Sequence, residues 1–377
     1  DEYGLIVCGW SAAWDVALRA ALERAPGRRY STYWSTRSPL GVEAQRLVLL
    51  RRAEVISGKD ANALFVELLE RVRDLGDLDR SPLTKDMAVA RAKRYLEEGN
   101  GARIRLHDLV MEETGRVYEQ INGPEFPSGG HGRVATAELA RRLERYTIIC
   151  DTLLALVIAG CRWGTADQES LWVASLERVV PADYDRGFGA LGTLRSYPAL
   201  LLLYGGCLAA LAGERYDTVA ALLLRVRVRD LGKGKSIFRQ LDPTNMLQVE
   251  DGRQIPGLTR SAPAGSDYVF RTLRTPLCSL LPDDAHYEQL FDFFEYLYAL
   301  LHADARLEAG DPLSAPVGRF ARNREFRRER LPALTEEIAT MGSEWPLLRA
   351  GLFGGSLELL NRVKLLLDQE MFSPGPW

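Results

Sequence analysis

A glycine, a tryptophan and a serine follow the first apolar run of this sequence. The run Tyr3–Cys8 has the composition of a strand, and Gly9, Trp10 and Ser11 separate it from a helical pattern that begins at Ala12. Glycine lets a backbone approach a ligand, a hydroxyl can bind it, and a helix N-terminus attracts phosphate. Since ligands of open parallel sheets bind at the carboxyl ends of strands, the spacing indicates a nucleotide-binding edge. The alternative is that the glycine only makes the turn and the serine only caps the helix.

The elements that must position these residues alternate over the first 75 residues. Strands are expected at Tyr3–Cys8, Arg28–Trp34 and Glu54–Ser57, and helices at Ala12–Arg24, Val42–Arg52 and Ala61–Leu75, the last capped by Asp60. This order predicts an α/β region: a partial Rossmann-like parallel sheet of three strands with helices, one face or edge of it open. Because three strands make a small sheet and no strand precedes the first, we expect the chain to begin inside a domain.

From Ser81 onward the periodicity is helical. The sequence therefore predicts a second domain, residues 76–377, that is large and all-α. Two segments rich in glycine and proline, Gly123–Gly132 and Gln248–Gly265, are expected to be exposed loops. The expected helices are Leu83–Glu98, Ile104–Ile121, Val134–Gly160, Gln168–Val179, Pro198–Ala212, Tyr216–Val228, His286–Ala309, Arg322–Met341 and Trp345–Gln369.

The composition is that of a soluble globular protein. Of the 377 residues, 46% are hydrophobic and 26% charged, and a net charge of −3 gives no whole-chain reason to expect nucleic acid or an acidic membrane as a partner. The apolar runs Ile148–Cys161 and Pro198–Ala212 are short for a bilayer and are expected to be buried helices. The five widely spaced cysteines favour reduced thiols in the cytoplasm. No histidine stands at a metal-ligand spacing, so no metal is predicted.

Two glycine-rich motifs match phosphate-binding patterns only in part. The glycines of GFGALG (187–192) follow PADYDR rather than a strand, so a loop between helices is the preferred interpretation. The stretch LGKGKS (231–236) ends like a phosphate loop, but the first glycine of that motif is missing, which favours a solvated basic turn.

Two further motifs have ordinary structural interpretations. RNREFRRER (322–330) interleaves Glu325 and Glu329 with its arginines, which is typical of a charged helix face rather than a nucleic-acid site. GWSAA (9–13) is one residue short of a nucleophile elbow. A hydrolase of that kind needs a histidine on the same sheet, and the histidines begin only at His107, in the helical region.

The segment Leu5–Leu22, followed by RRYSTYW (28–34) and AEVISGKDANALFVELLERV (53–72), resembles the C-terminal half of sirtuin-like domains, in the branch of prokaryotic NAD-consuming defence proteins. Gly9-Trp10-Ser11 stands where that family has a Gly-Thr-Ser or Gly-Tyr-Ser element that meets NAD. Asp15 matches an aspartate that often follows it. Tyr30–Trp34 is similar to the strand beside the adenosine ribose, and Glu54–Asp60 to the last strand, near the adenine.

The resemblance implies that Gly9, Trp10, Ser11, Asp15, Trp34 and Asp60 contact NAD. It also implies that the intact protein cleaves the nicotinamide–ribose bond of NAD, with the helical domain sensing a trigger or holding an oligomer. The family's Gly-Ala-Gly loop, Asn-Asp element and catalytic histidine precede the matched region and are not in this sequence, so we expect this chain alone to be inactive. The competing hypothesis is a non-catalytic helical interaction protein with a degenerate nucleotide-binding remnant.

Overall fold

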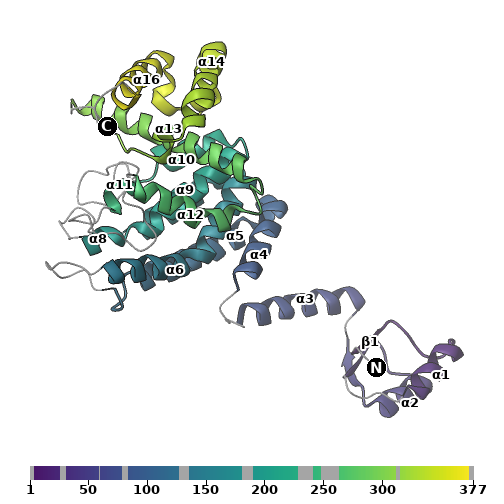
Figure 1. Ribbon diagram of the computed structural model, residues 1–377. Helices are drawn as coiled ribbons and strands as arrows, with labels where there is room; N and C mark the ends of the chain where they lie inside the picture. Colours follow the sequence, from purple (N-terminus) through teal and green to yellow (C-terminus); the bar gives the residue numbers. More distant parts are fainter. Residues whose placement is uncertain are drawn as a thin grey trace. The chain divides into compact units, whose positions relative to one another are not determined.

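The chain divides into two compact units, Asp1–Leu83 and Thr84–Trp377, in a computed structural model. The structure describes residues 4–25, 31–58, 60–78, 84–126, 136–180, 190–227, 241–247, 263–310 and 315–372. The first unit carries a three-stranded sheet. The second unit, which is drawn in blue to yellow in Figure 1, is mostly helical. The predicted fold class, α/β followed by all-α, is confirmed.

The sheet of the first unit is parallel, with the strands in the order β1-β2-β3. Leu5 pairs with Thr32, and Tyr33 with Glu54, so neighbours in the sheet are also consecutive along the chain. The elements are β1 (Leu5–Cys8), α1 (Val16–Arg24), β2 (Thr32–Thr36), α2 (Val42–Arg51), β3 (Glu54–Ser57) and α3 (Ala61–Leu78). Because the carboxyl ends of parallel strands meet at one edge, Gly9, Arg37 and Gly58 follow the strands on the same side of the sheet.

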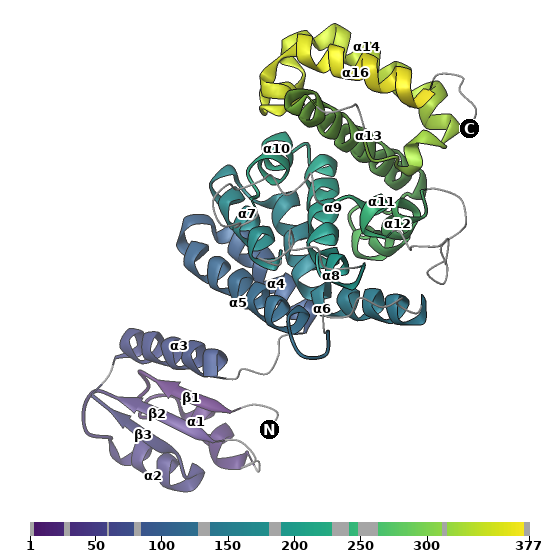
Figure 2. The same ribbon diagram turned by 90° about the vertical axis from the view of Figure 1, so that its left-hand side faces the viewer.

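The two faces of the sheet are covered to different degrees. Val7 and Trp34 point to the face that packs against Ala44 and Leu47 of α2, with Leu22 of α1 beside them. The opposite face, toward α3 in Figure 2, presents Ile6 and Tyr33, which remain 41% and 36% exposed. Half-exposed apolar residues on this face agree with the open face that the sequence predicts.

Helix α1 begins four residues later than the sequence predicts. Ala12 has a φ of 61°, in the left-handed region, so the helix cannot start there. The Ala12 carbonyl accepts a hydrogen bond from Nη1 of Arg19 at 2.8 Å, which fixes an additional turn between β1 and the helix. Asp15 is the residue that caps α1, since its Oδ1 accepts from the Leu18 N–H at 2.9 Å. The alternative interpretation, in which Ser11 caps the helix, is therefore wrong.

The second unit is helical over nearly all of its described residues. Single-turn 3₁₀ segments lie at Gly99–Ala102, Ala166–Gln168, Arg319–Ala321, Gly342–Glu344 and Leu352–Gly355, and Phe326–Arg330 forms a π-helix. Its α-helices are α4 (Lys85–Glu98), α5 (Arg103–Ile121), α6 (Thr136–Trp163), α7 (Glu169–Val179), α8 (Ala190–Leu194), α9 (Tyr197–Ala212), α10 (Tyr216–Leu224), α11 (Pro243–Met246), α12 (Ala264–Leu277), α13 (Asp284–Ala309), α14 (Leu331–Met341), α15 (Pro346–Arg349) and α16 (Leu357–Phe372).

Helix α9 forms the centre of this unit. Every residue from Tyr197 to Leu211 is buried, and the helix contacts α6, α7, α10, α12 and α13, which surround it in Figure 2. Glycines let the helices approach closely: a Cβ at Gly205 would lie 2.7 Å from Cδ1 of Leu154 on α6. A helix that is apolar on all sides is stable only when neighbours cover it completely, and here they do.

Most of the predicted helices are present with ends within a few residues, but three predictions are wrong. Helix α12 lies just beyond a segment expected to be a loop, and it was not predicted. The expected helix Trp345–Gln369 is interrupted, because Gly351, Phe353 and Gly354 all have positive φ angles. The expected helix Arg322–Met341 becomes regular only at α14, after the π-helical turn.

In the part of the chain that the structure describes, two helices are long and apolar enough to cross a membrane by length and composition, within Ala137–Trp163 and Gly192–Ala212. Their most apolar windows are 61% and 94% buried inside the structure. The core helix of a folded unit passes the same test, so these helices are weak evidence for a membrane.

Candidate functional site

A cavity of about 390 Å³ lies at the edge of the sheet where the strands end. It brings together four of the six residues that the sequence indicates, namely Gly9, Trp10, Ser11 and Asp60. The remaining lining residues are Cys8, Ser35, Thr36, Arg37, Ser38, Pro39, Leu40, Gly41, Ala44 and Ala61. Its volume falls in the range of about 300–1,000 Å³ that is usual for small-molecule sites.

Gly9 makes the turn at the end of β1. Its φ of 71° lies in the left-handed region, which an L-residue adopts only with strain. No atom lies within 4 Å of the place where a Cβ would stand, so the backbone here is open to a ligand. Ser11 is exposed, and its Oγ accepts a hydrogen bond from the Ala13 N–H at 3.3 Å. Both expected contributions, close backbone approach and a hydroxyl, are therefore available at the cavity.

Trp10 and Trp34 form a stacked pair beneath the cavity. Their ring centroids lie 5.6 Å apart with an angle of 24° between the ring planes. Trp34 is only 2% exposed and belongs to the core between the sheet and α2, whereas Trp10 is half-buried and lines the cavity. Trp34 therefore supports the wall from below, and Trp10 presents the aromatic surface that a ligand would meet.

Asp15, the remaining predicted residue, lies outside the lining. Its carboxylate is engaged in the cap of α1. Asp15 thus caps the helix that follows the Gly9–Ser11 turn, and its side chain does not line the cavity.

Arg37 and Asp60 form an ion pair at the cavity. Nη2 of Arg37 lies 2.8 Å from Oδ2 of Asp60, and Oδ1 of Asp60 accepts from the Ala63 N–H at 2.7 Å to cap α3. The hydrogen bond from Ala63, together with the charge of Arg37, lowers the pKa of Asp60, so this carboxyl stays ionised at neutral pH. Arg37 is a lining residue that was not predicted from the sequence. The signal that could have found it is a basic residue directly after the second strand.

The N-terminus of α2 also reaches the cavity. Gly41 is its N-cap residue and makes no side-chain hydrogen bond to the first turn, and both Gly41 and Ala44 line the cavity. The first N–H groups of a helix have no partner within the helix and carry partial positive charge. The edge of the sheet thus combines an aromatic wall, a guanidinium group and helix N–H donors, which can together bind a nucleotide.

The other motifs do not extend this site. Gly187, Gly189 and the LGKGKS stretch lie outside the described residues, and Gly192 belongs to the short helix α8. The histidines that the structure describes, His107, His286 and His302, are all in the helical unit, so the GWSAA turn has no described histidine on its sheet.

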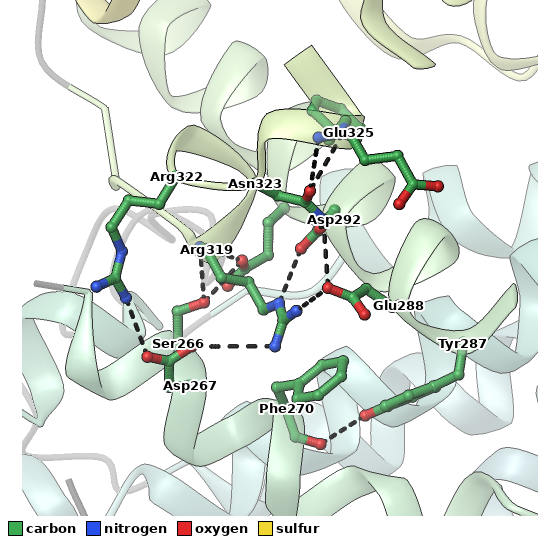
Figure 3. Close-up of polar contacts among 12 residues, drawn as sticks. Ser266, Asp267, Phe270, Tyr287, Glu288, Asp292, Arg319, Arg322, Asn323 and Glu325 are labelled. Carbon is green, nitrogen blue, oxygen red and sulfur yellow. Dashed lines mark hydrogen bonds and ion pairs between the residues drawn. The ribbon is translucent and has the colours of Figure 1, made fainter. Parts of the chain in front are cut away.

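A second polar cluster, in the helical unit, surrounds Arg319. Figure 3 shows the guanidinium of Arg319 directed at carboxylates of α13, and Nε lies 3.0 Å from Oδ1 of Asp292. Nη2 binds Glu288, and the guanidinium lies 3.6 Å from the centre of the Phe270 ring. Asn323 donates to the other oxygen of Asp292 at 2.6 Å. These bonds join the segment before α14 to α12 and α13.

Two buried carboxyls of this cluster have raised pKa values. Burial raises the pKa of Asp292 to about 6, against the opposing charge of Arg319. Burial likewise raises the pKa of Glu295 to about 8, although Oε2 of Glu295 accepts from Oγ of Ser266 at 2.7 Å and from the Arg319 N–H at 2.9 Å. A cavity of about 250 Å³ adjoins Asp292, but both oxygens of that carboxylate already have partners. We regard the cluster as structural.

The described residues contain no candidate metal site, since no group of three or more His, Cys, Asp or Glu side chains among them could hold an ion. The cysteines Cys150, Cys161 and Cys207 are free and buried, and burial raises the pKa of each thiol. Comparison of the chain with models of known protein families, with curated proteins and with solved structures gives no match.

Proposed function

We propose that the cavity at the edge of the sheet binds a nicotinamide adenine dinucleotide, and that the chain is the ligand-binding part of a sirtuin-like NAD-cleaving protein. The observation that supports this proposal is the convergence of Gly9, Trp10, Ser11 and Asp60 on one cavity at the carboxyl ends of the strands. Open α/β sheets bind nucleotides at this place.

Each lining group has a distinct part in binding. The open backbone at Gly9 admits a phosphate or ribose to van der Waals distance, and Trp10 provides a ring surface for a base. The uncapped N-terminus of α2 at Gly41 attracts the negatively charged diphosphate. A bound dinucleotide supplies the nicotinamide–ribose bond that water cleaves to nicotinamide and ADP-ribose.

The described residues that line the cavity include no histidine, which supports a role in binding rather than in proton transfer. In the intact protein we place the activity in prokaryotic defence, with the helical unit sensing a trigger or holding a homo-oligomer. We therefore expect the chain alone to bind NAD without releasing nicotinamide.

Calorimetric titration of NAD into the full chain tests the proposal. Gly41 has an ordinary φ of −67°, and no atom lies within 4 Å of an added Cβ, so Gly41→Val places bulk at the cavity wall without backbone strain. We expect this variant to bind NAD at least tenfold more weakly. Gly101→Val is the matched control, because Gly101 also has open space around its Cβ position but lies in the helical unit.

Two results would contradict the proposal: wild-type chain that does not bind NAD, or a folded Gly41→Val variant, checked by thermal melting, with an unchanged dissociation constant. The first result would favour the non-catalytic interaction protein. Nicotinamide release by the chain alone would instead contradict the assignment of a binding role only.

A further inference from the structure

We infer that the cavity selects nucleotides that carry a phosphate monoester on the ribose, as NADP does at its 2′ position, and that Arg37 binds this phosphate. The inference rests on the proposed function, since it names the class of nucleotide that the same cavity takes.

The position of Arg37 in the sheet is the first argument. Arg37 directly follows Thr36, the last residue of β2, and β2 pairs with β1, which ends at the open Gly9 turn. In dinucleotide-binding sheets the ribose of the adenosine lies near the end of the strand next to the glycine turn. A free carboxylate there binds the ribose hydroxyls, whereas an arginine accepts the 2′-phosphate.

The state of Asp60 is the second argument. Its two oxygens have separate partners, the Ala63 N–H at 2.7 Å and Arg37 at 2.8 Å. The carboxylate thus caps α3 and also holds the guanidinium of Arg37 at the cavity. Among the described residues that line the cavity, Asp60 is also the only acidic one.

The donors left on Arg37 are the third argument. The side chain is 70% exposed, and a guanidinium carries five N–H donors in a planar fork that matches phosphate oxygens. A phosphate monoester carries nearly two negative charges, and the uncapped N-terminus of α2 at Gly41 adds favourable potential at the same cavity. A ribose without phosphate gains little from these groups.

Titrations of the full chain with two pairs of nucleotides test the inference. NADP is compared with NAD, and adenosine 2′,5′-bisphosphate with adenosine 5′-monophosphate, at one fixed salt concentration. We expect the 2′-phosphorylated member of each pair to bind about tenfold more tightly, as a charge-assisted fork to phosphate implies. Arg37→Ala should remove this difference, and Arg37→Lys should restore part of it.

Arg46→Ala is the matched control. Arg46 has nearly the same exposure, 69%, and also pairs with a carboxylate, that of Glu23 at 3.8 Å, but it does not line this cavity. We expect this variant, which makes the same change in net charge, to keep the preference for 2′-phosphate.

The outcomes separate the two claims. Binding of NAD and NADP with equal affinity, or an equal effect of Arg37→Ala and Arg46→Ala on NADP, would overturn the inference and leave the proposed function standing. If none of the four nucleotides binds to wild-type chain, the proposed function itself fails.

Discussion

The buried carboxyl of Glu295 should make the stability of the helical unit fall as the pH rises toward 8. Glu295 is 4% exposed, and a Cβ at Gly318 would lie only 2.4 Å from its Oε2, so the chain packs directly on this group. Burial raises its pKa from 4.5 to about 8. A folded-state pKa above the unfolded value favours the protonated folded form, so this contribution is fully present below about pH 4.5 and is lost as the pH rises to about 8.

The magnitude follows from proton linkage. Each unit of difference in pKa corresponds to about 1.4 kcal/mol. Between pH 6 and pH 8.5 this single carboxyl should therefore lower the free energy of unfolding by about 2–3 kcal/mol. Glu295→Gln replaces the carboxyl by a neutral amide of nearly the same shape. The variant should lose this part of the pH dependence, and its stability relative to wild type should rise by the same amount over that interval.

Hydrogen exchange of the amides of α12 and α13 at the two pH values, corrected for the intrinsic exchange rate, measures the effect in the full chain. Contributions from titrating groups outside the Arg319 cluster are common to both proteins and cancel in the comparison. Glu325→Gln is the control, because Glu325 lies near the same cluster in Figure 3 but is exposed. Identical pH dependence in wild type and Glu295→Gln would refute the reasoning.

Two further predictions concern close packing and the buried ion pair. A Cβ at Gly160 would lie 1.9 Å from the ring of Trp172, so Gly160→Ala should lower the free energy of unfolding by about 1–3 kcal/mol and with it the melting temperature. Gly101→Ala, where the added Cβ meets open space, should not lower it. Equal melting temperatures of the two variants would contradict this account. Arg319→Ala leaves Asp292, 0% exposed, without its guanidinium and should cost about 3–5 kcal/mol in thermal or chemical unfolding. Adding Asp292→Asn should recover part of that loss, and a double variant no more stable than the single one would show that the charge is not the cause.

The sheet was predictable because its signals are local. Alternating strand and helix patterns define the order of the elements, and Asp60 precedes a clear amphipathic run. The start of α1 was predicted wrongly because Ala12, an ordinary helix former, is held in the left-handed region by a hydrogen bond from Arg19, seven residues away. Asp15, a good N-cap residue just before Val16, was the available signal.

The helical unit shows which features a sequence pattern hides. Helix α12 follows a segment rich in glycine and proline and contains Pro276, and its buried residues Val269 and Leu273 are fixed by packing that the sequence does not display. The interruption after α15 was signalled by Gly351 and the glycines that follow it, but their positive φ angles depend on the turn that the chain makes there.

The candidate site was predicted in part, because the signals for four of its residues are local in the sequence. Gly9, Trp10 and Ser11 are adjacent in sequence, and Asp60 follows the third strand, so the parallel order alone brings them to one edge. Arg37 was missed because its importance arises from the pairing of β2 with β1 and from the ion pair with Asp60, neither of which is written in the spacing of residues.

The contrast between α9 and α1 determines where the molecule opens first. Every residue of α9 from Tyr197 to Leu211 is buried, so its amides exchange with solvent only when much of the helical unit unfolds. Helix α1 has no buried residue, so it opens at a small free-energy cost, and only residues 12–15 separate it from the Gly9–Ser11 turn. A ligand that binds only the closed turn suppresses this opening by mass action. Binding of a ligand in the cavity should therefore slow the hydrogen exchange of the α1 amides and leave the exchange of the α9 amides unchanged.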